Sequence, residues 1–199
     1  MAESDRDRAL AGAALLVIDV QDSFVHRPYW PERNNPDFER NVARLIATFR
    51  DAGRPVIFVL HSQPDGPFAK DGPHYKLMDF IERRPDEPLV HKTTRNAFTS
   101  TDLLPILLQA GVTRIAISGI QTEQCCETTA RVGADLGFAV DFVTEATLTF
   151  PIPKSEAPDA DVLSTTDIVE RTEYVLRGRF ARIVTVAQIE AELPVLAGG

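Results

Sequence analysis

The sequence predicts a three-layer α/β/α protein built on a Rossmann-like, six-stranded and mostly parallel sheet. Apolar runs of strand length alternate with segments of helical spacing, and a glycine ends four of the helical segments: Gly53, Gly111, Gly137 and Gly178. Glycine readily takes the left-handed conformation that ends a helix and turns the chain back toward a sheet. Alternation of strands and helices is typical of a parallel sheet that is covered by helices on both faces.

Six segments have the composition of strands in such a sheet. The first, Ala13–Val20, is a continuous apolar run with β-branched residues, which suits a strand buried on both faces. The other five are Val56–Leu60, a short stretch that ends near Lys92, Arg114–Ser118, Ala139–Val143 and Ile183–Val186.

The segments between these strands have the spacing of helices. Apolar residues recur at helical intervals from Val42 to Phe49, and further helices are expected over Leu103–Ala110, from Thr122 to Gly137, over Thr166–Arg177 and after Ala187. Three irregular stretches, 22–37, 61–74 and 150–161, each follow a strand. We expect them to gather at the carboxyl ends of the strands, where open α/β sheets bind ligands.

Composition limits the class of protein. With 199 residues, 44% of them hydrophobic, the chain suits one domain over 1–199, with 1–10 as a flexible tail. The net charge of −8 argues against nucleic-acid partners, and no apolar run approaches the ~20 residues that span a bilayer. The charged N-terminus lacks the apolar core of a signal peptide, and two adjacent cysteines make a poor disulfide framework. We expect a reduced, cytoplasmic protein without a membrane partner.

Cys125 is the candidate nucleophile. Thr122 is a suitable N-cap, Glu123 suits the positive end of a helix, and Cys125 falls in the first turn. Unpaired N–H groups at a helix start favour the thiolate form of cysteine. The alternative is that Cys125 is simply a small buried apolar residue, as most free cysteines are.

Two charged residues end predicted strands and can join this cysteine. Asp19 ends the first strand, where a buried carboxylate needs a partner, and Lys92 ends the short third strand. The ends of parallel strands meet at one edge of the sheet, so Asp19, Lys92 and Cys125 can converge there. The alternatives are a surface ion pair for Asp19 and a solvated Lys92.

Three segments carry a family resemblance. Ala14–Phe24 contains Asp19, Gln21 and Phe24 in the pattern Asp-x-Gln-x-x-Phe; Lys92–Leu103 and Gly119–Ala130 follow in order. Together they resemble the isochorismatase-like cysteine hydrolases, over roughly residues 13–187 of the chain. That family includes nicotinamidases, N-carbamoylsarcosine and ureidoacrylate amidohydrolases, and isochorismatases.

The resemblance implies roles for these residues. Asp19 would be the general base, Lys92 its electrostatic partner and Cys125 the nucleophile. It also implies a cis peptide between Ile120 and Gln121, which would aim the N–H groups of Gln121 and Cys125 at one point as an oxyanion hole. No cofactor is implied, and the protein is expected to be a homodimer or homotetramer.

The sequence departs from the family's metal-binding pattern. Nicotinamidases of the family hold a metal through Asp-x-His after the second strand, whereas this chain reads Leu60-His61-Ser62 there. His61, Asp65 and His74 match no metal motif by spacing. We therefore expect no metal, which argues against nicotinamide as the substrate.

The resulting functional prediction is a cysteine hydrolase that cleaves a C–N bond of a small amide, carbamoyl or ureido compound through a thioester. The alternatives are an isochorismatase that hydrolyses an enol ether, and an inactive relative that serves as a binding or assembly module. The glutamines at 63, 121 and 124 favour a neutral substrate over a strongly anionic one. The candidate pocket residues are Gln21, Phe24, Tyr29, Trp30, His61, Gln121 and Phe150.

Overall fold

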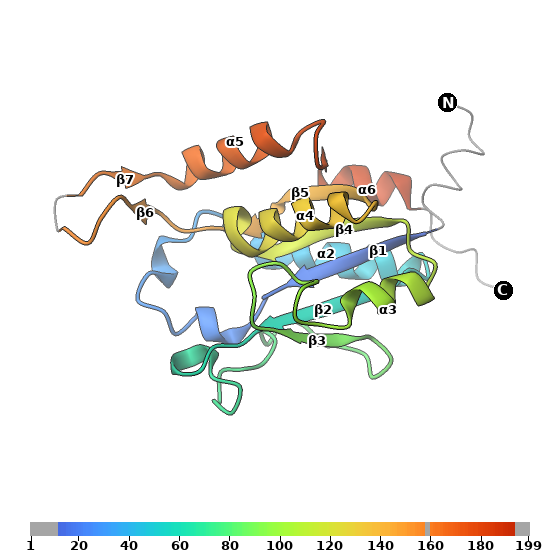
Figure 1. Ribbon diagram of the computed structural model, residues 1–199, viewed down its shortest axis with the longest axis horizontal. Coiled ribbons are helices and arrows are strands. Elements are labelled where there is room, and N and C mark those ends of the chain that lie inside the picture. Colours follow the sequence, from blue (N-terminus) through green and yellow to red (C-terminus); the bar gives the residue numbers. More distant parts are fainter. Residues whose placement is uncertain (1–11, 158–159, 194–199) are drawn as a thin grey trace.

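The computed structural model describes residues 12–157 and 160–193 and contains the predicted six-stranded parallel sheet (Figure 1). The strand order is β3-β2-β1-β4-β5-β8, and every neighbouring pair is parallel. The strands are β1 (Ala13–Ile18), β2 (Val56–His61), β3 (Leu89–Lys92), β4 (Arg114–Ile120), β5 (Ala139–Leu148) and β8 (Arg182–Ile183). The predicted fold class is confirmed.

Helices cover both faces of this sheet. They are α2 (Phe38–Asp51), α3 (Leu103–Gln109), α4 (Glu127–Asp135), α5 (Thr165–Leu176) and α6 (Val186–Glu192). Helices α2 and α6 pack on one face, α3 and α4 pack on the other, and α5 lies beside α4 (Figure 1). Among the described residues, no helix is long and apolar enough to cross a membrane.

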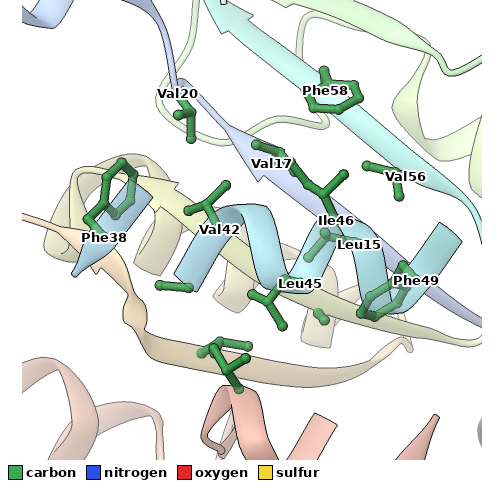
Figure 2. Close-up of a cluster of buried hydrophobic side chains, with 14 of the residues drawn as sticks. Leu15, Val17, Val20, Phe38, Val42, Leu45, Ile46, Phe49, Val56 and Phe58 are labelled. Atoms are coloured by element: carbon green, nitrogen blue, oxygen red, sulfur yellow. The ribbon is translucent and has the colours of Figure 1, made fainter. Parts of the chain in front are cut away.

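Strand β1 lies in the interior of the sheet, and its side chains pack on both faces. Leu15 and Val17 join the cluster formed with Val42 and Leu45 of α2, as Figure 2 shows. Leu16 and Ile18 point to the opposite face, in the cluster that includes α3 and α4. This two-sided burial explains the unbroken apolar run, and each such side chain contributes about 1.5–3 kcal/mol.

The C-terminal third differs from the prediction. Strand β5 continues to Leu148, and the predicted strand Ile183–Val186 stops at Ile183 because Thr185 caps α6. A capping box forms there, in which the Thr185 and Gln188 side chains each bond the other residue's backbone N–H. A small antiparallel pair, β6 (Ile152–Pro153) with β7 (Val162–Leu163), was not predicted, because two-residue strands leave no periodic pattern.

Backbone conformation confirms the helix-ending glycines. The φ angles of Gly53, Gly111, Gly137 and Gly178 are +61°, +66°, +94° and +70°. The predicted tail over 1–10 lies outside the described residues, as does the segment after residue 193.

Gly119 allows β4 to lie close to β1 at the carboxyl end of the sheet. Its φ is +133°, and a Cβ atom there would lie 1.9 Å from the carbonyl oxygen of Ile18, its partner in the strand register. No side chain fits that space without a shift of backbone. A glycine is therefore required one residue before Ile120.

We expect Gly119→Ala to lower the free energy of unfolding by about 3 kcal/mol or more, through backbone strain and overlap with Ile18. Gly137→Ala is the matched control, because its φ is also positive but the added Cβ meets nothing within 4 Å. That change should cost about 1 kcal/mol. Urea unfolding of both variants measures the difference, and equal midpoints would contradict this account of Gly119.

Candidate active site

Four neighbouring strands bring polar residues to one edge of the sheet. Asp19 follows β1, His61 and Lys92 end β2 and β3 in register with each other, and Cys125 follows β4. The structure therefore brings together the three residues that the sequence predicted to converge.

Lys92 is the hub of this group. Its Nζ donates hydrogen bonds to Oδ2 of Asp19 at 2.7 Å, to Sγ of Cys125 at 3.3 Å and to the Thr94 carbonyl at 3.2 Å. Both charged side chains are almost completely buried, at 0% and 1% exposure. Neither the surface ion pair nor the solvated lysine considered from the sequence is found.

Asp19 occupies an unusual backbone conformation. Its φ is +53°, which no other non-glycine residue in the described part of the chain matches. Aspartate tolerates this left-handed region better than most residues, and the Asp19 N–H still bonds the Val59 carbonyl at 2.9 Å. The turn breaks the strand at the position where the carboxylate must meet Lys92. Oδ1 of Asp19 is buried without a hydrogen-bond partner.

The segment that presents Cys125 differs from the predicted helix start. Gln121, not Thr122, is the N-cap, and residues Thr122–Cys126 form a π-helical turn before α4. The Cys126 N–H bonds the Gln121 carbonyl at 3.2 Å, whereas the Thr122 hydroxyl bonds Thr147 at 2.8 Å. Thr122 therefore anchors the turn to β5 rather than capping the helix. The Ile120–Gln121 peptide bond is cis, at the position that the resemblance implies.

Electrostatics contradict the expected thiolate. Burial, followed by the negative charge of Asp19, raises the pKa of Cys125 to about 12. Burial also raises the pKa of Asp19, although the charge of Lys92 and its hydrogen bond oppose this. The thiol is therefore protonated near neutral pH and must lose its proton before it can act as a nucleophile.

His61 lies between two cationic side chains. Its Nδ1 is 3.2 Å from Lys92 Nζ, and its Nε2 is 3.2 Å from the Arg95 guanidinium. Burial and then the charges of Lys92 and Arg95 lower the pKa of His61 to about 4. The imidazole is therefore neutral at pH 7.

Asp19, His61 and Cys125 border a cavity of about 600 Å³. Asp19 and Cys125 line it together with five of the predicted pocket residues: Phe24, Tyr29, His61, Gln121 and Phe150. Gln21 and Trp30 do not line it, which corrects the prediction. The Gln21 side chain instead bonds the backbone N–H and carbonyl of His61, and Trp30 packs against Phe150.

Comparisons with known proteins agree with this arrangement. The family model of the isochorismatase domain matches residues 13–176. The chain belongs to the isochorismatase family. It is accordingly a hydrolase with an isochorismatase-type fold.

Individual relatives support the family membership. Over 192 residues the chain is 34% identical to a streptothricin hydrolase of Streptomyces noursei, covering 92% of this chain and 66% of that protein. It is 36% identical over 154 residues to nicotinamidase 3 of Arabidopsis thaliana, covering 69% and 74%. A crystal structure of a putative hydrolase of the isochorismatase family from Chromobacterium violaceum has a TM-score of 0.83 and 29% identity, covering 92% and 94%.

His61, Asp65 and His74 were considered from the sequence as possible metal ligands, and they do not come together as one site in this isochorismatase-family hydrolase. His61 and Asp65 belong to no group of three or more potential ligands within the described part of the chain. Both ring nitrogens of His61 face cationic groups, which disfavours a metal ion beside them. These residues do not fit the metal of the nicotinamidase pattern.

Two arginines in the cavity of this isochorismatase-family protein were missed. Arg27 and Arg95 both line it, and Nε of Arg27 is buried without a hydrogen-bond partner. Glu32, Phe68, Ile152 and Val162 also line the cavity without having been predicted. All of these residues lie in irregular segments or in the β6–β7 hairpin. The only sequence feature that could have indicated their role is that their segments follow strands.

The raised pKa of Cys125 leads to a test with two variants. Asp19→Asn removes the charge that helps to keep the thiol protonated, so we expect iodoacetamide to alkylate Cys125 faster at pH 7 than in the wild type. Lys92→Met removes the cation that favours the thiolate and should slow alkylation. Mass spectrometry of the Cys125 peptide measures both rates. Slower alkylation in Asp19→Asn would contradict the assigned electrostatics and would mean that Asp19 acts on the thiol mainly by accepting its proton.

Proposed function

We propose that this hydrolase cleaves a C–N bond of a small amide, carbamoyl or ureido compound through a thioester on Cys125. The observation that carries the proposal is the buried contact of Lys92 Nζ with both Asp19 and Cys125 beside the cavity. A thiol with a raised pKa needs a nearby base to attack a carbonyl, and Asp19 is the carboxylate in reach.

The reaction proceeds in two halves. Asp19 takes the proton of the Cys125 thiol, and Sγ attacks the carbonyl carbon. The backbone N–H groups of Gln121 and Cys125 stabilise the oxyanion. Asp19 returns the proton to the leaving nitrogen, the C–N bond breaks, and ammonia or an amine departs. Asp19 then takes a proton from water, the hydroxide attacks the thioester, and Cys125 leaves with that proton.

The cavity narrows the substrate class. Gln63, Gln121 and Gln124 line it and suit the carbonyl and N–H groups of an amide. Arg27 and Arg95 also line it, which favours a substrate with an anionic group and revises the neutral substrate expected from the sequence. We therefore propose an amide that carries a carboxylate.

Ammonia release from a panel of carboxylated and neutral amides, carbamoyl and ureido compounds tests the proposal. We expect Cys125→Ala to lower turnover by at least about 1000-fold, because the thioester cannot form. Cys126→Ala is the matched control: this cysteine is also buried, but it lies outside the cavity lining, and its loss should leave turnover close to wild type.

Two outcomes would contradict the thiol mechanism. Turnover that survives in Cys125→Ala would show that the thiol is not the nucleophile. Release of pyruvate from isochorismate, without release of ammonia from any compound of the panel, would support the enol-ether alternative.

We also propose that the protein is a cytoplasmic homodimer or homotetramer. Both cysteines are free, which suits a reducing compartment. The β6–β7 hairpin extends from the body and exposes Val162 and Leu163 at 56% and 48% (Figure 1). Apolar side chains on such an arm are typical of contacts between subunits.

Light scattering should therefore give two or four times the 22.0 kDa of one chain. Replacing Val162 and Leu163 with serine should reduce the mass toward that of a monomer, because the apolar contact is lost. A monomeric wild type at micromolar concentration would contradict this part of the proposal.

A further inference from the structure

A cluster of potential metal ligands lies outside the active site. Asp22 begins the short helix η1 (Asp22–Phe24), His26 follows one turn later, and His74 comes from the long connection between β2 and β3. One ligand atom from each residue lies within 4.8 Å of the other two. None of the three lines the catalytic cavity.

Hydrogen bonds that do not involve the three ligand side chains hold this cluster together. The Asp22 N–H donates to the Lys76 carbonyl at 2.9 Å, and the Ser23 hydroxyl donates to the His74 carbonyl at 2.8 Å. The segments that carry the three side chains are therefore already joined. A ligand that binds the three side chains does not have to bring these segments together.

The two distances to the Asp22 carboxylate match those between ligands of one metal ion. Oδ2 of Asp22 lies 3.2 Å from Nε2 of His26 and 3.1 Å from Nδ1 of His74. Ligands held about 2.0–2.2 Å from a metal at 90–110° are themselves roughly 3.0–3.5 Å apart. Two of the three ligand pairs thus have the spacing that a bound ion requires. The two imidazole nitrogens lie within 4.8 Å of each other, and the two rings, stacked at 3.4 Å between centroids, must turn apart to bind one ion.

We propose that Asp22, His26 and His74 form a binding site for a divalent transition-metal ion such as Zn²⁺. Two imidazoles and one carboxylate are a donor set suited to zinc and neighbouring metals. The side chains remain 17%, 40% and 35% exposed, so an ion has access and water can complete the coordination. The nearby cation Lys76 is engaged by Asp79 at 2.7 Å.

Such an ion would act on the cavity through its wall. The loop that carries Asp22 and His26 also carries Phe24, Arg27 and Tyr29, which line the cavity. His74 belongs to the connection that supplies Phe68, whose ring meets that of Phe24 edge-on at 4.9 Å. The metal would pin these two walls together; it would not touch the reacting atoms.

Titration of the EDTA-treated full chain with Zn²⁺, with binding measured by calorimetry, tests the site. We expect one equivalent per chain and a rise in thermal midpoint. His26→Gln and His74→Gln should each weaken binding by at least about 10-fold, because even groups outside the first coordination shell contribute that much. His91→Gln is the matched control, since this histidine bonds Tyr75 and does not belong to the group of three ligands, so its loss should leave the affinity unchanged.

Titration with Co²⁺ separates this site from the active-site thiol. Binding at the proposed site gives d–d bands without a thiolate-to-cobalt charge-transfer band. The proposal is overturned by the absence of stoichiometric binding, by affinity that is unchanged in both His26→Gln and His74→Gln, or by a charge-transfer band that Cys125→Ala removes. An Asp22→Asn variant gives a third, independent test of the same three-residue set.

Discussion

The buried ion pair between Lys92 and Asp19 is the interaction on which the active site depends. Two charges removed from water carry a desolvation cost that only close pairing and further hydrogen bonds offset. Lys92 meets this demand with Asp19, Cys125 and a carbonyl, all within 3.3 Å. Loss of one partner would strand a charge at a cost of about 3–5 kcal/mol. The same contacts therefore stabilise the fold and hold Cys125 beside Asp19.

The sheet supplies the rigidity that this pair requires. Strand β1 bonds β2 on one side and β4 on the other, so the position of Asp19 is fixed by two registers at once. A slip by one residue would exchange the two apolar faces of β1 and expose or overpack Leu15 and Leu16. Gly119 lets β4 approach closely at the level of Ile18. Core packing thus sets the geometry of the site before any loop contributes.

Most of the fold could be predicted because its signals are local and repeated. The apolar run of β1, the helical spacing from Val42 to Phe49 and the helix-ending glycines all reflect burial patterns that a sequence displays directly. Convergence of Asp19, Lys92 and Cys125 followed from strand ends alone. The residues that line the cavity could not all be predicted from the sequence. Arg27 and Arg95 lie in irregular segments whose path is set by contacts with distant parts of the chain. The raised pKa of the Cys125 thiol could not be predicted either, because its largest cause is burial, which depends on the folded structure.

The raised pKa of both Asp19 and Cys125 clarifies how such a site can react at all. A proton that passes from Sγ to the carboxylate moves a negative charge without creating one, so the net charge of the buried group stays constant. Lys92 contacts both possible locations of that charge and stabilises either. The neutral His61 adds no competing charge beside it. Desolvation raises the pKa of both Asp19 and Cys125. A substrate that enters the cavity can therefore shift the position of the proton between the carboxylate and the thiol. A surface cysteine with an already ionised thiol would be more exposed to oxidants and would gain nothing from Asp19 as a base.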